Sequence, residues 1–148
     1  MKTTISLTFF SILSAAVLFF AACGSGVQPT AENPIQGKVI KDGPIGNSLK
    51  VTLSNDTGRL KSGDQEIMVA FTDGSGKAVD VGAASLNFYM PAMGSMAAMN
   101  DTAALSTTAA PGVYKGRVKI EMPGEWQAQI AFEGAAGNGK TSIPVTAN

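Results

Sequence analysis

Residues 126–132, with the sequence WQAQIAF, alternate apolar side chains with polar or small ones. Successive side chains of a β-strand point to opposite faces, so this period of two predicts a strand with one buried face. The buried row would contain Trp126, Ala128, Ile130 and Phe132. A helix would need apolar residues at three–four spacing together with strong helix formers, and this stretch has neither.

The same alternation recurs along the chain from residue 49 onward. The apolar rows are Leu49, Val51 and Leu53; Ile67, Val69 and Phe71; Leu86, Phe88 and Met90; Tyr114, Val118, Ile120 and Met122; and Ile143 and Val145. Turn signals separate them, with DGSG at 73–76 and Asn-Gly at 138–139. This pattern predicts an all-β domain over residues 45–148, an immunoglobulin-like β-sandwich of about seven strands.

The N-terminus has the features of an export signal over residues 1–22. Lys2 supplies a positive charge, and residues 5–20 are apolar apart from Ser and Thr. Small residues then precede Cys23, the single cysteine of the chain, which resembles a bacterial lipobox. Phe20 departs from that pattern, in which Leu is usual. We predict that Cys23 is acylated, with palmitate among the chains, and attaches the protein to a membrane. A conventional signal cleaved nearby and an uncleaved membrane helix are the alternatives.

Two further features describe the predicted anchor. Gly24 stands where Asp would mark inner-membrane retention, so we expect a cell-envelope protein on the outer membrane, facing the periplasm. Residues 23–44 are rich in Gly, Pro, Asn, Thr and Gln, a composition typical of a flexible tether.

Composition excludes several classes of function. Lys and Arg number 11 and so do Asp and Glu, which leaves no basic surplus for nucleic acid. Histidine is absent, so Ser–His and Cys–His catalytic pairs and Cys/His zinc sites cannot form. Two carboxylate pairs, Asp64 with Glu66 and Glu121 with Glu125, alternate with apolar residues as solvated strand faces do. The sequence therefore predicts a protein that is not an enzyme.

The most unusual segment is residues 90–99, MPAMGSMAAM, where methionine occupies every third position. Pro91 and Gly94 predict a loop rather than a helical turn. Thioether sulfur is a soft ligand suited to Cu(I), and methionine is also a common filler of apolar cores. Both roles remain open for these residues.

Position along the strands separates the methionines. Met90 and Met122 continue apolar rows, which favours core packing over metal ligation. Met93, Met96 and Met99 lie among Gly, Ser, Ala and Asn, where no alternation requires apolar residues. We predict a Cu(I) site centred on these three, with Met90 and Met122 as further candidate ligands. Trp126 could shield the ion by cation–π attraction, although core packing is the favoured interpretation for it.

A second hypothesis needs no metal. The methionine-rich loop would then be an adaptable apolar surface for an envelope protein partner.

Two features of residues 111–119 have structural explanations. Tyr114 follows Pro111-Gly112 and resembles a tyrosine-corner residue, whose hydroxyl ties a crossing loop to the start of a strand. Lys115, Arg117 and Lys119 form an outward basic stripe. A solvated face is the expected explanation, and contact with anionic headgroups near the anchor is the alternative.

Several short motifs together resemble the YtkA-like family over residues 45–146. They are residues 61–64 and 71–79, the run 83–93 that ends in Met-Pro-Ala-Met, Gly112-Val113-Tyr114, and Met-Pro-Gly-Glu-Trp at 122–126. The resemblance implies an exported immunoglobulin-like domain, of a kind often found near copper handling, oxidase assembly or metal efflux. Relatives often carry a histidine in or after the Met-Pro-x-Met segment, and this chain has none, so its ligands for copper would be thioethers alone.

Overall fold

The computed structural model describes residues 34–148, and within them the chain forms eight β-strands and no helix. The strands are β1 (Lys38–Ile45), β2 (Leu49–Asn55), β3 (Gly63–Thr72), β4 (Ala83–Met90), β5 (Met99–Thr107), β6 (Val113–Ile120), β7 (Gly124–Gly134) and β8 (Gly137–Ala147). The all-β prediction is confirmed, with one strand more than expected. The predicted signal peptide, Cys23 and the first part of the tether lie outside the described residues.

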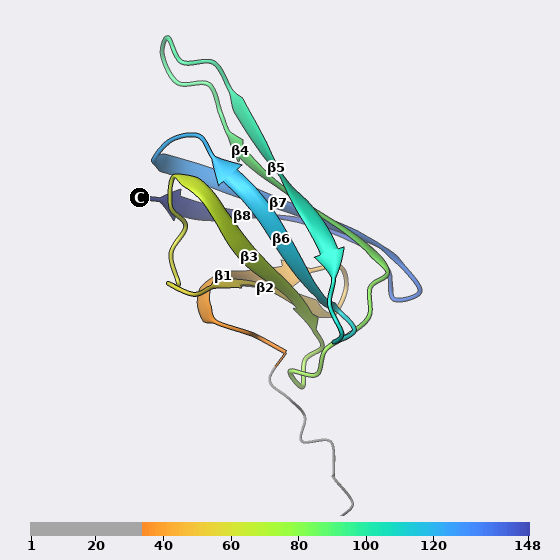
Figure 1. Ribbon diagram of the computed structural model, residues 1–148. Helices are drawn as coiled ribbons and strands as arrows, with labels where there is room; N and C mark the ends of the chain where they lie inside the picture. Colours follow the sequence, from red (N-terminus) through yellow and green to blue (C-terminus); the bar gives the residue numbers. More distant parts are fainter. Residues whose placement is uncertain (1–33) are drawn as a thin grey trace, which may run out of the picture. The chain divides into compact units, whose positions relative to one another are not determined.

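The strands pair antiparallel in the order β1-β2-β3-β6-β5-β4-β7-β8 (Figure 1). β5 connects the two layers, because residues 99–103 pair with β4 and residues 104–107 pair with β6. Strands that change sheets in this way form the corners of a sandwich. The two ends of the order, β1 and β8, also lie in contact, so the sheet curls almost into a barrel.

The alternating rows seen in the sequence form the core between the layers. The largest fully buried side chains are Trp126, Phe71, Phe88, Ile45, Leu53, Leu60, Ile67, Leu86, Met90, Ile120, Ile130 and Val51. Phe71 makes edge contacts with Tyr114 and Phe132, with ring centroids 5.8 and 5.7 Å apart. Such pairs add to the stabilisation that comes from burying the rings.

Residues 38–44 belong to β1 and not to a tether. They pair with β2 from Lys38↔Asn55 onward, and the Ser54 hydroxyl donates to the carbonyl of Gln36 at 2.6 Å. The folded domain therefore begins before residue 45. Only Ile45 of β1 is buried, so the strand lacks the apolar alternation that identifies its neighbours.

Tyr114 occupies the position that the sequence predicts. Its hydroxyl donates to the carbonyl of Gly82 at 2.5 Å, which ties the loop before β4 to the start of β6. Burial raises the pKa of Tyr114, and the negative charge of Asp80 acts in the same direction.

A methionine hairpin as the candidate functional site

The candidate site is the hairpin that joins β4 to β5. Met90 pairs with Met99 at the end of the ladder, and Met93 pairs with Met96 farther out. The Met93 and Met96 backbones exchange two hydrogen bonds of 3.1 and 3.0 Å. Gly94 begins the two-residue turn between them with φ of +58°, a conformation that favours glycine. We call residues 90–99 the methionine hairpin.

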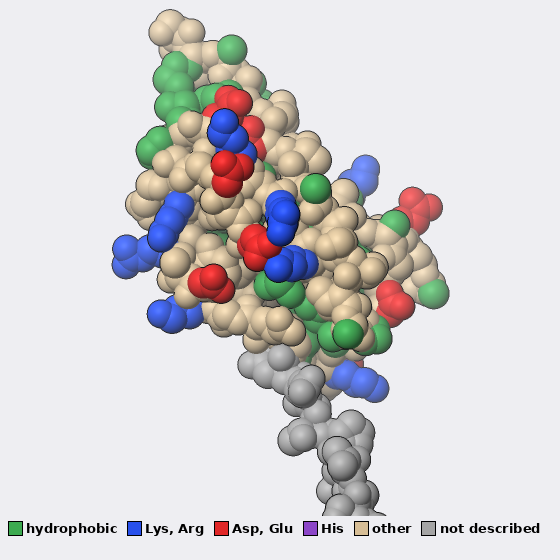
Figure 2. All heavy atoms as spheres, viewed as in Figure 1, with side chains coloured by type: hydrophobic (Ala, Val, Ile, Leu, Met, Phe, Trp, Pro, Cys, Tyr) green, Lys and Arg blue, Asp and Glu red, His purple; other side chains and the backbone are tan. Residues whose placement is uncertain are grey.

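The methionine hairpin projects beyond the rest of the sandwich (top of Figure 1). At its tip Met93 and Met96 are 52% and 40% exposed, although both are large apolar residues. Residues 90–100 include no charged side chain. Figure 2 shows hydrophobic side chains along this projection, whereas Lys, Arg, Asp and Glu are spread over the body of the domain.

Met90 and Trp126 lie in the core, each only 1% exposed. The terminal methyl of Met90 packs against Gly124, where an added Cβ would meet it at 2.8 Å. The Trp126 indole N–H donates to the backbone carbonyl of Met122 at 3.1 Å. This arrangement matches the packing alternative for both residues and places neither at the tip of the hairpin.

The structure orders the methionines as pairs along the hairpin and not as one cluster. Met99 and Met122 are half-buried against the core. The Met93–Met96 pair is three positions from the Met90–Met99 pair along each side of the hairpin, which corresponds to about 10 Å of extended chain. Met68, which the sequence analysis did not consider, is half-buried on β3, and no signal in the sequence connects it to the others.

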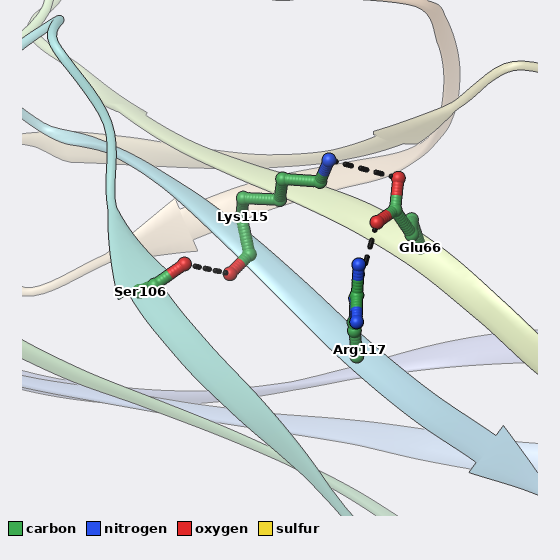
Figure 3. A network of polar contacts seen from close by, with 4 residues as sticks. All are labelled: Glu66, Ser106, Lys115 and Arg117. Carbon is green, nitrogen blue, oxygen red and sulfur yellow. Dashed lines mark hydrogen bonds and ion pairs between the residues drawn. The ribbon is translucent and has the colours of Figure 1, made fainter.

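The predicted basic stripe forms ion pairs with Glu66 (Figure 3). Lys115 Nζ lies 2.9 Å from Glu66 Oε2, and Arg117 Nε lies 3.2 Å from Glu66 Oε1. The hydrogen bond from Lys115 lowers the pKa of Glu66 most, and Arg117 lowers it further. Ser106 donates to the backbone carbonyl of Lys115 at 3.2 Å. All four side chains are exposed, as on a solvated strand face.

The two carboxylate pairs considered in the sequence lie on strand faces and at strand ends. Asp64, Glu66, Glu121 and Glu125 are all exposed. Glu125 accepts a hydrogen bond of 2.7 Å from Thr146. Within residues 34–148, no three or more Asp, Glu, His or Cys side chains gather as a metal-binding group. Thioethers are therefore the soft donors that this part of the chain offers.

The antiparallel strand order and the absence of helices in residues 34–148 place this domain among the all-β sandwiches. Comparison with family models then identifies its family. The model described as YtkA-like matches residues 45–131, which is more than half of the chain. The protein belongs to the YtkA-like family. Comparisons with curated proteins and with solved structures find no match. Within the described residues, no helix is long and apolar enough to cross a membrane.

Proposed function

We propose that this chain is a lipid-anchored envelope domain that binds Cu(I) at the tip of the methionine hairpin. One observation carries the proposal: Met93 and Met96 lie directly opposite each other and are both exposed. Side chains that oppose each other on an antiparallel pair leave the same face, with Cβ atoms about 5 Å apart. Two thioethers held in this way can approach one ion without rearrangement of the backbone.

The donor set determines which ion fits. Thioethers select Cu(I), whereas Zn(II) and Cu(II) prefer imidazole, thiolate or carboxylate ligands that this hairpin lacks. Met99 is the next donor along the chain and would complete a three-sulfur site. Residues 97–98 between Met96 and Met99 belong to no paired segment, which leaves room for that adjustment. Met90 and Met122 would form the apolar base of the hairpin.

The position of the hairpin suits a tethered protein. The described chain begins at one end of the sandwich, and the methionine hairpin projects from the opposite end (Figure 1). If Cys23 is acylated, the anchor would be connected through the end of the sandwich that does not carry the hairpin. Attachment is tested by Cys23→Ala, which should release the protein from the membrane fraction and abolish labelling with radioactive palmitate. Unchanged retention of Cys23→Ala would refute the anchor.

Copper binding is tested with the full-length protein in detergent. Cu(I) is titrated against a competing chelator, and the double variant Met93→Leu, Met96→Leu should bind at least about tenfold more weakly, because leucine keeps the apolar volume and removes the sulfur. Met68→Leu is the matched control and should bind as the unmodified protein does. Equal affinity of the double variant, or no binding tighter than micromolar, would refute the proposal.

A second function is favoured by the absence of charge on the hairpin. An uncharged apolar projection can insert into a recess of an envelope partner, with methionine adapting to its shape. Leucine substitutions separate the two functions: Met93→Leu, Met96→Leu should keep partner binding but lose copper. Met93→Asp, Met96→Asp should lose both. Cross-linking in intact cells, with and without a copper chelator, measures the partner directly.

A further inference from the structure

The outer face of strands β5, β4, β7 and β8 carries a continuous surface of uncharged side chains, most of them polar. The pairing registers align these residues in two rows across the four strands. One row is Thr102, Asn87, Gln129 and Ser142, and the other is Asn100, Tyr89, Gln127 and Pro144. We call these eight residues the amide face. They contrast with the outer face of β3 and β6, where Glu66, Lys115 and Arg117 form ion pairs.

Hydrogen bonds fix the orientation of the amides. The Asn87 side-chain nitrogen donates to Asn100 at 3.1 Å and to Gln129 at 3.3 Å, and the Asn87 oxygen accepts from Thr102 at 3.0 Å. The Gln127 oxygen accepts from Ser142 at 3.4 Å. Asn87 thus uses both amide donors and its oxygen to hold its neighbours in place.

This network leaves donors free for a ligand. Asn100, Gln127 and Gln129 each accept through the side-chain oxygen, so each directs its NH₂ group elsewhere. Within residues 34–148 these three nitrogens donate to no protein acceptor. Tyr89 lies between them on the register and is half-buried, and its hydroxyl likewise has no partner in the described chain.

We propose that the amide face binds a neutral glycan chain of N-acetylhexosamine units. A half-exposed tyrosine offers a rigid apolar surface to the C–H groups of a sugar ring, at a small cost in side-chain entropy. The free NH₂ groups around Tyr89 suit the acetamido carbonyl, an uncharged acceptor that such a glycan repeats along its length. Because these donors are already oriented, binding requires little further ordering.

Charge decides between this ligand and others. None of the eight residues of the amide face is charged, and the nearest charged side chains on the same outer face, Lys140 and Glu125, lie at its edges with opposite signs. An anionic polymer would therefore find no charge-assisted partner within the face itself. The side chains of the amide face are amides and hydroxyls with one aromatic ring and one proline, whereas the buried centre of a protein interface is more apolar. A polyhydroxylated chain without charge matches both properties. The site is independent of the methionine hairpin and of any metal.

The test is NMR titration of the isotope-labelled full-length protein in detergent with a hexamer of N-acetylglucosamine. Shifts should occur for amides of β4, β5 and β7. Tyr89→Ala should weaken binding about tenfold and Gln129→Ala about threefold, because each removes one contact. Gln36→Ala removes an exposed amide away from this face and should change nothing, and Met93→Leu, Met96→Leu should also bind normally.

Three results would overturn the proposal. They are the absence of shifts at millimolar hexamer, equal affinity for an unacetylated glucose hexamer, and unchanged affinity in both Tyr89→Ala and Gln129→Ala. Thermal unfolding of each variant separates loss of the site from loss of the fold. Because Gln129 is exposed, Gln129→Ala should unfold within a few degrees of the unmodified protein.

Discussion

Replacing Met90 and replacing Met93 should have very different effects on stability. Met90 is 1% exposed, and its methyl group packs against Gly124. Truncating a buried methionine to alanine removes its transfer free energy and leaves a cavity, for a loss of about 2–5 kcal/mol. For a domain of this size a loss near 3 kcal/mol lowers the melting temperature by about 10–20 °C. Met93 is 52% exposed, and Met93→Ala should change the free energy of unfolding by less than about 0.5 kcal/mol.

Thermal and urea unfolding of Met90→Ala, Met93→Ala and Met96→Ala measure this contrast. Met90→Leu is the control for volume, because a swap of similar size in a core costs less than about 1.5 kcal/mol. A melting temperature for Met90→Ala equal to that of the unmodified protein would refute the division between packing and exposed methionines. A loss in Met93→Ala as large as that in Met90→Ala would refute it equally.

Three further predictions concern single polar groups. Tyr114→Phe should lower the free energy of unfolding by about 0.5–1.5 kcal/mol, because the hydrogen bond to the Gly82 carbonyl disappears. An unchanged denaturation midpoint would contradict a stabilising role for this hydrogen bond. Thr52→Val should raise the melting temperature slightly, since the Thr52 hydroxyl is buried without a partner in the described chain; marked destabilisation would show that it has one. The pKa of Glu66 is depressed, so its carboxylate should still hold both ion pairs when the pH falls to the ordinary pKa of glutamate. The ion pairs should be lost as the pH falls further, through the lower pKa of the folded protein. Carboxyl NMR titration should show the Glu66 pKa rising in Lys115→Ala, and no rise would contradict the assignment.

Most of the fold follows from apolar alternation, and the two strands that the sequence did not reveal lack it. β1 buries only Ile45, so nothing in residues 38–44 distinguished it from a tether. β5 buries only Ala103, because it passes from one sheet to the other at a corner. β1 forms by backbone pairing with β2, and β5 forms by backbone pairing with β4 and β6. Backbone pairing of this kind does not require alternating apolar residues, so the sequences of β1 and β5 do not show it.

The amide face is likewise a feature that could not be predicted from the sequence. Asn87, Thr102 and Gln129 are ordinary polar residues in sequence, at separations of 15 and 42 positions from Asn87. Their association depends on which strands become neighbours and in what register. Alternation indicates that these side chains face outward, but only the strand order β5-β4-β7 places them side by side.

The methionine spacing has a different explanation once the hairpin is known. A methionine at every third position suggests a loop that wraps around one ion. In a hairpin, however, the residues that lie opposite each other are those at equal distances from the turn. Gly94 and Ser95 form the centre, so Met93 pairs with Met96 and Met90 pairs with Met99. Within the inner pair, Met90 continues the core row of β4 and Met99 is half-buried on β5, while the outer pair extends beyond the sandwich. The single repeat therefore divides into the packing residue Met90, the exposed pair Met93 and Met96, and the half-buried Met99, and the hypothesis of copper binding depends on Met93 and Met96 first.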